Sequence, residues 1–447
     1  MTPIQNNSIF IINLGCAKNL VDSNVISQIL TSSGYKHAYS MREAKFVIIN
    51  TCGFIHDARV ESQEVIADAL KNRRKGQYVI ASGCLSQRLN AELYQQFPTL
   101  DGLVGTRNLK DILLLLDDLS KTSRPKQNTL PAYTELMVDA NISNTIIQGG
   151  SSYLKIADGC HRTCAFCAIP LIKGPLVSRP KEAVIRDALE LQRAGIKEIN
   201  LIAQDVTAYG LDRGESDALA DLLTKLLPLI PNVPWIRLLY TYPGMVTDRL
   251  IDLMAGDNQL LPYLDIPLQH ADPTVLKTMS RPSNVEWVTN TIAKMRRLIP
   301  NLVVRTTMIV GYPNESQRSF EILRDFVRDT EFDHLGVFTY SPEMDTSSFL
   351  LMDPIPLEVK EARKAELMEL QAGISQARLK KLRGETLKIL VEGVNPEEHL
   401  LVGRTYRDAP EIDGLAIASG IAEEGDLVFI RVTNTTEYDI IGEQLKK

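Results

Sequence analysis

The chain has 447 residues, more than one hydrophobic core of ordinary size holds, and this length predicts two to four domains. Its formal net charge of −6 argues against a protein that binds nucleic acid mainly through phosphate contacts, and its 44% hydrophobic and 23% charged residues are ordinary for a globular protein. The first residues lack a basic leader and no apolar stretch approaches the roughly 18 residues that span a membrane, so we expect a cytoplasmic protein without a membrane partner.

Three short apolar runs rich in Ile and Val mark the first hundred residues: IFIINLG, KFVIIN and QYVIAS. Such runs are typical of buried parallel strands. Helical patterns separate them, one around residues 21–30 that Gly34 ends and one over about 54–74. The alternation predicts an α/β domain with a parallel sheet over residues 8–121.

A polar stretch with two prolines, SKTSRPKQNTLPAY, predicts a linker over residues 122–145. Six candidate strands with amphipathic segments between them then predict a complete or partial TIM-type (β/α)6 barrel over residues 146–377. The strands are YLKIAD, EINLIAQD, WIRLLYTYP, YLDIPLQH, LVVRTTMIVGYP and HLGVFTYSP. A long charged helix over about 357–383 follows, and short strands separated by turn residues predict a small all-β barrel over residues 380–447.

Six cysteines are spread along the chain. They are Cys16, Cys52, Cys84, Cys160, Cys164 and Cys167. A disulfide framework is the alternative for an even number of cysteines, but it is typical of small secreted proteins. In a long chain with sparse cysteine, metal binding or catalysis is the favoured interpretation.

The stretch DGCHRTCAFC spaces three cysteines as CxxxCxxC, directly after the first predicted barrel strand. One alternative is a zinc site completed by His161, but adjacent residues rarely both reach one tetrahedral metal. A structural or electron-transfer iron–sulfur cluster would normally use four cysteines. Three thiolates on a 4Fe–4S cluster leave one iron open, and an open metal position is typical of catalytic sites.

This spacing and its place after a barrel strand resemble the radical S-adenosylmethionine superfamily. The resemblance implies that Cys160, Cys164 and Cys167 are catalytic iron ligands and that S-adenosylmethionine occupies the open iron. One electron from the cluster would then cleave the cofactor to a 5′-deoxyadenosyl radical. Phe166 would pack near the adenine, with plain core packing as the alternative.

The other three cysteines each follow one of the apolar runs, and each has a glycine as a direct neighbour. The pairs are Gly15 with Cys16, Cys52 with Gly53, and Gly83 with Cys84. Ligands of open α/β sheets gather at the carboxyl ends of strands, and glycine permits close approach. We therefore predict a second cluster at this edge, with three unrelated buried thiols as the alternative.

Together these segments resemble the methylthiotransferase family, which combines an N-terminal α/β domain, a radical barrel and a C-terminal barrel of the TRAM type. LGCAKNLVDS, NTCGFI, SGCLSQR, YLKIADGCHRTCAFCAIP and RTTMIVGYP carry the resemblance. It implies two 4Fe–4S clusters, one holding an external sulfur, and S-adenosylmethionine as both methyl donor and radical source.

The segment GRTYRDAPEIDG, residues 403–414, resembles the protein-modifying RimO branch of that family. This implies methylthiolation of an aspartate β-carbon in small-subunit ribosomal protein twelve, a basic protein, free or within the ribosome. An electron donor and a sulfur donor are implied as further partners, and no nucleic-acid substrate. The alternatives are a transfer-RNA adenosine methylthiotransferase and a non-enzymatic iron–sulfur or ribosome-binding protein.

Further side chains are expected at the site. Gln204 and Asp205 end the second barrel strand and His270 ends the fourth, so we predict that Gln204 and Asp205 contact the cofactor; strand-end capping is the alternative. Residues 381–447 contain 8 Lys and Arg against 13 Asp and Glu, a formal charge of −5 that would attract a basic protein. Three acidic residues are predicted to dock the target, with a solvated turn as the alternative: Asp408, Glu411 and Asp413.

Overall fold

The computed structural model describes residues 7–121, 128, 130 and 140–445. The predicted linker over residues 122–145 lies largely outside this described part. The chain divides into two compact units, which interleave in the sequence. The first comprises Met1–Ile146, Lys155–Ala183 and Glu343–Thr346, and the second comprises Ile147–Leu154, Val184–Pro342 and Ser347–Lys447.

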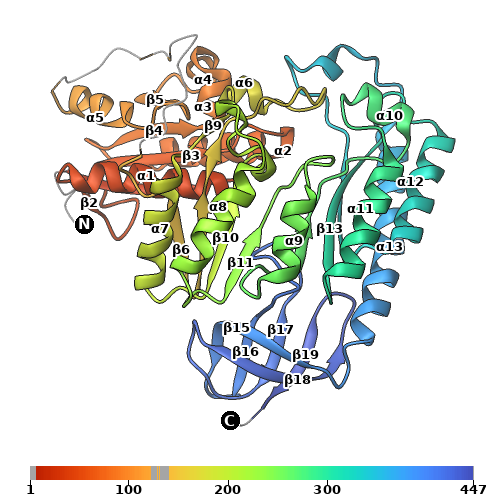
Figure 1. The fold of residues 1–447 in the computed structure, drawn as a ribbon. Helices are drawn as coiled ribbons and strands as arrows, with labels where there is room; N and C mark the ends of the chain where they lie inside the picture. Colours follow the sequence, from red (N-terminus) through yellow and green to blue (C-terminus); the bar gives the residue numbers. More distant parts are fainter. Residues whose placement is uncertain (1–6, 122–127, 129, 131–139, 446–447) are drawn as a thin grey trace. The chain divides into compact units, whose positions relative to one another are not determined.

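The first unit contains a five-stranded parallel sheet of order β2-β1-β3-β4-β5 (Figure 1). Its strands are β1 (Ser8–Asn13), β2 (Lys36–His37), β3 (Phe46–Thr51), β4 (Tyr78–Gly83) and β5 (Gly102–Val104). The connecting helices are α1 (Ala17–Ser32), α2 (His56–Lys71), α3 (Cys84–Leu89), α4 (Ala91–Gln96) and α5 (Asp111–Lys121). This confirms the predicted α/β domain with a parallel sheet.

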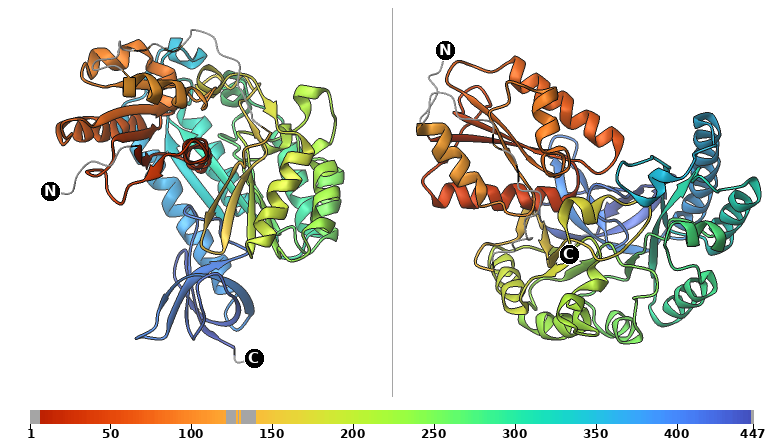
Figure 2. Two further views of the ribbon diagram at one scale, coloured as in Figure 1. Left: turned by 90° about the vertical axis from the view of Figure 1, so that its left-hand side faces the viewer. Right: turned by 90° about the horizontal axis from the view of Figure 1, so that it is seen from above.

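Helices cover both faces of this sheet (Figure 2). Alternate residues of the central strands, such as Val47 and Val79, pack with Ile66 and Ala69 of α2 in one apolar cluster. On the other face, Asn50 of β3 bonds to α1 through Ser23 Oγ at 2.8 Å. Because strands buried on both faces lack polar/apolar alternation, they appear in the sequence as the continuous apolar runs described above.

The first unit also contains the segment from Lys155 to Ala183. Here β8 (Ala157–Asp158) pairs antiparallel with β9 (Val177–Ser178), and α6 (Ile169–Lys173) lies in the loop between them. The paired strands hold the two ends of this loop together, so the loop has a fixed base. It carries the CxxxCxxC cysteines.

Most of the six predicted barrel strands belong to the second unit, in two sheets of order β11-β10-β7-β6 and β12-β13-β14. The strands are β6 (Thr145–Gln148), β7 (Ser151–Lys155), β10 (Glu198–Ile202), β11 (Trp235–Leu238), β12 (Tyr263–Asp265), β13 (Val303–Val310) and β14 (His334–Thr339). The helices between them are α7 (Lys181–Arg193), α8 (Ala218–Leu226), α9 (Asp248–Gly256), α10 (Pro273–Thr278), α11 (Val285–Leu298) and α12 (Gln317–Thr330). A parallel bridge between Ile236 and Leu260 links the two sheets, which is the arrangement of a partial barrel.

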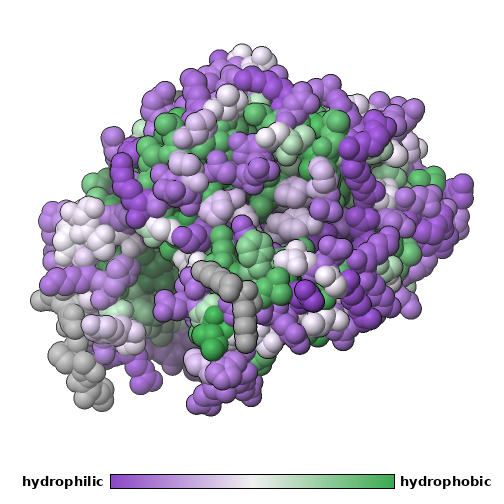
Figure 3. All heavy atoms as spheres, turned by 60° about the horizontal axis from the view of Figure 1, so that its bottom comes forward, coloured by the Kyte–Doolittle hydropathy of each residue, from purple (hydrophilic) through white to green (hydrophobic). Residues whose placement is uncertain are grey.

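Helix α13 (Leu357–Lys380) leads to a closed five-stranded barrel of order β15-β16-β17-β19-β18. Its strands are β15 (Thr386–Asn395), β16 (Leu400–Thr405), β17 (Ala416–Ser419), β18 (Leu427–Thr435) and β19 (Ile440–Gln444). Gly403 allows β16 to lie against β15, because a Cβ there would come within 2.1 Å of the Leu390 carbonyl oxygen. Hydrophilic residues cover most of the face shown in Figure 3, with small apolar patches between them.

The predicted fold class, with a parallel α/β sheet, a partial barrel and a small closed β-barrel, is thus confirmed. The helix expected over 54–74 is shorter, His56–Lys71, because the terminal NRRKG stretch leaves the helix before Gly76, where φ is +84°. The short strand β6 falls at the predicted linker boundary and lacked a long apolar run. Within the described ranges, no helix combines the length and apolar character needed to cross a bilayer.

Candidate functional site

Three cysteines, here called the N-terminal triplet (Cys16, Cys52 and Cys84), lie at the carboxyl ends of three adjacent strands. Cys16 caps the start of α1 after β1, Cys52 follows β3, and Cys84 begins α3 directly after β4. These strands are neighbours in the sheet, in the order β1-β3-β4. The predicted convergence on one sheet edge is therefore a consequence of the parallel topology.

Glycines allow the three cysteine segments to approach one another. A Cβ on Gly15 would come within 2.8 Å of the Cys52 Cβ and 3.0 Å of its Sγ. A Cβ on Gly53 would come within 2.8 Å of the Cys84 carbonyl oxygen. Any larger residue at either position would push the segments apart, so these glycines serve the close packing of the site.

A buried asparagine of α1 fixes the first two segments. The side-chain amide of Asn19 donates to the Leu14 backbone carbonyl at 2.6 Å and to the Asn50 and Thr51 backbone carbonyls at 3.3 Å each. The side-chain amide of Asn50 donates back to the Asn19 backbone carbonyl at 2.8 Å. The backbone before Cys16 and the backbone before Cys52 are therefore held by a single side chain.

A carboxylate from a distant part of the chain supports the third segment. Glu343, whose side chain is 3% exposed, pairs with Arg88 of α3 at 2.9 Å and accepts from the His56 amide at 3.1 Å. Arg88 also donates to the Gly53 carbonyl at 2.8 Å. This network joins α3 to the start of α2 around the loop that carries Cys52.

Burial affects the protonation of two thiols of the N-terminal triplet, Cys52 and Cys84. It raises the pKa of the Cys84 thiol strongly, and the nearby Lys173 ammonium lowers it only in part. Burial also raises the pKa of Cys52, and the negative charge of Cys16 adds to this shift. Because the thiolate is the form that binds metal, binding of a metal by these thiols would release protons.

The second set, here called the loop triplet (Cys160, Cys164 and Cys167), lies on the loop that β8 and β9 close. The Cys160 amide donates to the Gly174 carbonyl at 3.1 Å, which links the start of the loop to its end. The Cys167 amide donates to the Cys164 carbonyl at 3.0 Å, forming a turn between two of the thiols. Gly159, with φ of +73°, is required where the chain passes Pro175, since a Cβ would come within 2.0 Å of that carbonyl oxygen.

None of the six cysteines forms a disulfide, so the disulfide alternative is wrong. In the described part of the chain, no group of three His, Cys, Asp or Glu side chains converges to hold a single metal ion. A 4Fe–4S cluster distributes its ligands over separate irons and does not need such convergence. Each triplet, three thiols on closely packed or hydrogen-bonded segments, fits a cluster with three protein ligands.

A buried group of four charges lies beside these segments and was not predicted from the sequence. The group, here called the charge cluster, consists of Asp22, Lys155, Asp158 and Lys173, with side chains between 2% and 5% exposed. Lys173 pairs with Asp22 at 2.6 Å and with Asp158 at 3.2 Å, and Lys155 pairs with Asp158 at 2.8 Å and also with Asp22. Lysines within the apolar stretches YLKIAD and IPLIK were the available signal, because an isolated charge in an apolar run needs a buried partner.

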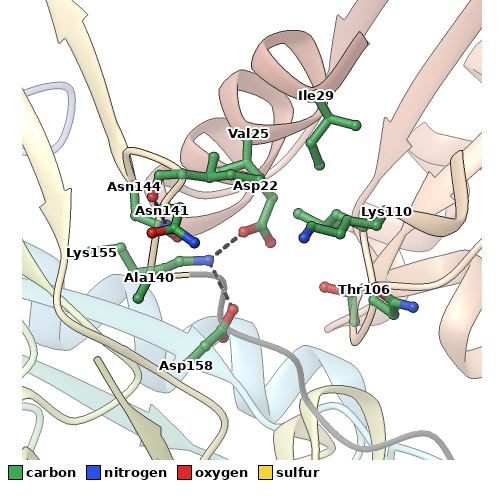
Figure 4. Close-up of a pocket in the computed structure, with 13 residues that line it drawn as sticks. Asp22, Val25, Ile29, Thr106, Lys110, Ala140, Asn141, Asn144, Lys155 and Asp158 are labelled. Carbon is green, nitrogen blue, oxygen red and sulfur yellow. Dashed lines mark hydrogen bonds and ion pairs between the residues drawn. The ribbon is translucent and has the colours of Figure 1, made fainter. Parts of the chain in front are cut away.

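The charge cluster borders a cavity of about 330 Å³ within the first unit (Figure 4). Lys155 points its ammonium between the carboxylates of Asp22 and Asp158, while Val25 and Ile29 of α1 supply an apolar wall. Burial disfavours the charge of Lys173, but the negative charges of Asp158 and Asp22 offset it and raise its pKa well above the usual value. Lys173 therefore stays cationic beside the N-terminal triplet.

The other predicted site residues have local roles. Asp205 caps the 3₁₀ turn Val206–Ala208 and accepts from the Ala208 amide at 3.2 Å. His270 is buried, accepts from the Asp272 amide at 2.9 Å and lies 3.4 Å from Glu315. Phe166 is half-buried in the cysteine loop, and Gln204 lies two residues after the end of β10. Cofactor contact by Phe166, Gln204 and Asp205 stays a prediction.

The structure contradicts the docking role predicted for two acidic residues of residues 403–414. Asp408 is 3% exposed and accepts from Thr405 Oγ1 at 2.7 Å. The Asp413 side chain is 2% exposed; it accepts from the Tyr263 hydroxyl at 2.6 Å and pairs with Arg305 at 3.2 Å. Both carboxylates are thus buried and hydrogen-bonded inside the second unit and unavailable to a partner. Glu411 alone is exposed, where it accepts from Gln148 at 2.9 Å.

Three family models match the chain in the order of its regions. Residues 8–105 match a model described as uncharacterized protein family UPF0004, residues 154–327 match the radical SAM superfamily, and residues 384–445 match the TRAM domain. The first two matches contain the N-terminal triplet and the loop triplet, respectively.

Full-length relatives have one name in common. A protein of Lachnoclostridium phytofermentans called ribosomal protein uS12 methylthiotransferase RimO is 39% identical over 97% of this chain and 99% of the relative. Relatives with the same name from Thermoanaerobacter sp. (strain X514) and Myxococcus xanthus are 40% and 37% identical, covering 97% and 98% of this chain and 99% and 92% of theirs.

Solved structures show the same fold at low identity. The radical S-adenosylmethionine methyltransferase TsrM from Kitasatospora setae, with cobalamin and a [4Fe-4S] cluster bound, has a TM-score of 0.55 at 13% identity, over 76% of this chain and 77% of that one. The cobalamin-dependent radical enzyme OxsB, with aqua-cobalamin and S-adenosylmethionine bound, has a TM-score of 0.53 at 11% identity, over 81% and 56%. At such identities the likeness concerns the fold alone.

Proposed function

The chain belongs to the RimO family of radical S-adenosylmethionine methylthiotransferases, and we propose that it replaces a hydrogen on the β-carbon of an aspartate in ribosomal protein uS12 with a methylthio group. Within this proposal the enzyme uses two 4Fe–4S clusters, one at each cysteine triplet, and S-adenosylmethionine as both methyl donor and radical source. It is a transferase, and its cytoplasmic location stays a prediction.

The single observation that carries the two-cluster proposal is the packing of the N-terminal triplet. Gly15 and Gly53 bring the segments of all three cysteines together, and a negative charge on Cys16 raises the pKa of both Cys52 and Cys84. Three unrelated buried thiols would not require glycine at two contacts between segments. A radical enzyme that needed only its loop triplet would have no use for this second set.

The residues of each triplet would serve different steps. When bound, a cluster with an open iron supplies an electron for cleavage of S-adenosylmethionine at the loop triplet and a coordination position for sulfur at the N-terminal triplet. Gly159 and the hydrogen bond from the Cys160 backbone amide to the Gly174 carbonyl hold the loop triplet on its closed loop. Asn19 and Arg88 hold the segments of the N-terminal triplet.

The choice of a basic protein over RNA as substrate is supported by charge. Residues 381–447 contain 8 basic and 13 acidic residues, a formal charge of −5. Two of these basic residues, Arg404 and Arg407, and two of the acidic residues, Asp408 and Asp413, are buried, so their charges cancel and the other residues of this range still sum to −5. An acidic surface repels phosphates and speeds encounter with a basic ribosomal protein.

Mass spectrometry of uS12 and of transfer RNA from cells with and without this protein tests the proposal. We expect uS12 to carry a methylthio group on one aspartate only when the protein is present, and the modified nucleosides of transfer RNA to be unchanged. A methylthio group lost from adenosine, with uS12 unaffected, would instead establish the transfer-RNA enzyme. An unmodified uS12 and unmodified RNA in both cells would leave a non-enzymatic protein.

A further inference from the structure

The charge cluster joins the two segments that carry the cysteine triplets. Asp22 belongs to α1, whose first residue directly follows the first cysteine of the N-terminal triplet. Lys155 and Asp158 lie on strands β7 and β8, which lead to the loop triplet, and Lys173 ends α6, which follows it. Asp22 is thus the one member from the N-terminal segment, and it accepts from both lysines.

The two segments also meet through apolar contacts at the same place. Cys84, Ala168 and Ile172 form one buried cluster, which puts α6 against the third cysteine of the N-terminal triplet. Arg107, on the loop after β5, donates to the Ile172 carbonyl at 2.9 Å and to the Leu171 carbonyl at 2.6 Å. The segment next to Lys173 is therefore held by ion pairs, by an apolar contact and by the hydrogen bonds of Arg107.

Stability alone does not account for four charges in this position. Burial of charges is costly, and apolar side chains of similar volume often serve stability equally well. Charged hydrogen bonds differ from apolar contacts in being directional, because each ammonium must point at its carboxylates. A closed set of alternating charges therefore fixes the register between segments, which apolar packing alone does less strictly.

We propose that the charge cluster positions the two cysteine triplets relative to each other, with Asp22 as the positioning residue that holds the N-terminal triplet at a fixed separation from the loop triplet. The inference rests on the proposed function, in which sulfur held at one triplet is joined to a carbon activated at the other. Misplacement of reacting groups by about 1 Å can lower a rate about a hundredfold, so a fixed separation has a direct catalytic value.

The substitution Asp22→Asn tests this role in the full-length protein with reconstituted clusters. It keeps the shape of the side chain but removes the charge that both lysines share. Three readouts are needed: iron content, 5′-deoxyadenosine formation without the protein substrate, and the magnetic coupling between the two reduced clusters in electron paramagnetic resonance. We expect unchanged iron, cleavage within about twofold of the wild type, altered coupling, and methylthio transfer to uS12 lowered at least about tenfold.

A matched control is available in the second unit. Glu198 is fully buried and pairs with Arg237 at 2.8 Å and with Arg404 at 2.5 Å, so Glu198→Gln makes the same chemical change in another buried ion cluster. We expect this control to lower the thermal unfolding temperature as much as Asp22→Asn does, with wild-type coupling. The substitution Asp22→Glu keeps the charge and is expected to recover most of the coupling and the transfer.

The outcomes separate the two proposals. A wild type that does not hold two clusters, or that does not methylthiolate uS12, contradicts the proposed function, and a wild type whose two clusters are not coupled overturns the positioning role alone. A normal wild type with an Asp22→Asn variant of normal coupling and transfer overturns the positioning role. Loss of iron from Asp22→Asn would assign the charge cluster to folding, and equal defects in the Asn and Glu variants would show that charge pairing does not matter; both results also overturn it.

Discussion

Each of the two compact units contains buried ion pairs, but the pairs join different parts of the chain. In the first unit, the charge cluster links the segments of the two cysteine triplets. In the second unit, residues 403–414 are joined to the radical-domain strands: Arg404 pairs with Glu198 of β10 and Asp413 with Arg305 of β13. The first set lies beside the cysteine triplets, and the second connects the C-terminal barrel to the radical-domain strands.

The difference teaches how a charged motif should be interpreted. Residues 403–414 have three acidic residues in a short stretch, which predicted an exposed docking surface. The structure shows two of the three buried: Asp413 pairs with Arg305, and the His334 ring lies 3.8 Å from Asp408 and 3.6 Å from Asp413. A run of charges predicts a surface only if no buried partner exists elsewhere, and the partners here lie in apolar strands.

The largest expected effect is the loss of S-adenosylmethionine cleavage at the loop triplet of the first unit. Replacing the loop triplet with Ala should abolish 5′-deoxyadenosine formation and halve the iron content, because the remaining thiols hold only the other cluster. Anaerobic reconstitution, iron analysis and chromatography of the nucleoside products measure both quantities. Cleavage at the wild-type rate in this variant would contradict the radical assignment.

Replacing the N-terminal triplet with Ala should distinguish the functions of the two triplets. Reductive cleavage of S-adenosylmethionine should persist, since the loop triplet and its closed loop are intact. Methylthiolated uS12 should be absent, because no thiols remain to hold the sulfur-bearing cluster. If this variant formed product normally, the three N-terminal cysteines would be structural only.

The ion pairs that connect the C-terminal barrel in the second unit should contribute to the free energy of unfolding. Asp413→Asn removes the carboxylate that Arg305 and His334 share, although Arg305 keeps Asp265 at 3.1 Å. The loss of hydrogen bonds to a charged group typically costs about 1.5–3 kcal/mol. Both tryptophans, Trp235 and Trp287, lie in the second unit, so their fluorescence during urea unfolding reports on this unit alone. Iron content should be unchanged, which distinguishes this variant from those of the first unit.

A second carboxylate of the same segment sharpens the contrast. Burial raises the pKa of Asp408 more than His334 and Thr405 lower it, so its ionised form is less favourable in the folded chain than in the unfolded one. For Asp413, burial is outweighed by His334, Arg305 and Tyr263, and the pKa is lowered. We therefore expect Asp408→Asn to cost about 1 kcal/mol or less, measured by the same fluorescence experiment. Equal losses in the two variants would contradict this contrast.

The sign of the pH dependence follows from these directions. A lowered folded pKa means that ionised Asp413 stabilises the protein above its unfolded pKa of about 3.9, and that this contribution is lost as the pH falls through the folded value. Because Asn imitates the protonated acid, the difference in unfolding free energy between wild type and Asp413→Asn should narrow below pH of about 4. Urea titrations of both proteins at several pH values measure it, and a gap that widens in acid would show the wrong sign.

The sequence predicted what depends on local pattern. Apolar runs gave the parallel sheet and the six barrel strands, and strand ends next to glycine gave the N-terminal triplet. It could not predict the charge cluster, because Asp22 and Lys173 lie on helices far apart in the chain and only the fold brings them to 2.6 Å. The same holds for Glu343, which supports α3 from beyond β14.

The error over Asp408 and Asp413 has the same physical origin. Pairing between distant residues depends on which segments the fold brings together, and a single sequence does not contain that information. Composition, by contrast, does not depend on the fold. The acidic excess of residues 381–447 was correctly counted. Because two basic and two acidic residues of this range are buried, their burial leaves the excess unchanged.

The smallest expected effect tests what remains of the docking idea. Glu423 and Glu424 are exposed in the turn before β18, and reversing both to Lys changes the formal charge of residues 381–447 from −5 to −1, with 10 basic against 11 acidic residues. Long-range attraction mainly affects the association rate, so we expect purified uS12 to associate about two- to fivefold more slowly at low salt. The difference should shrink as the salt concentration rises, since screening weakens the field of both proteins.

A matched reversal of Glu358 and Glu361, which are exposed on α13 outside the C-terminal barrel, is the control. It makes the same change in net charge for the whole chain, so it separates a local field from total charge. Stopped-flow association of labelled uS12 measures both variants, with the cleavage of S-adenosylmethionine as the check on folding. If the control slowed association as much as the barrel variant, total charge would explain the effect and the C-terminal barrel would have no special part in docking. If neither variant slowed it, charge would not guide the encounter, and the selection of uS12 would have to rest on contacts at close range.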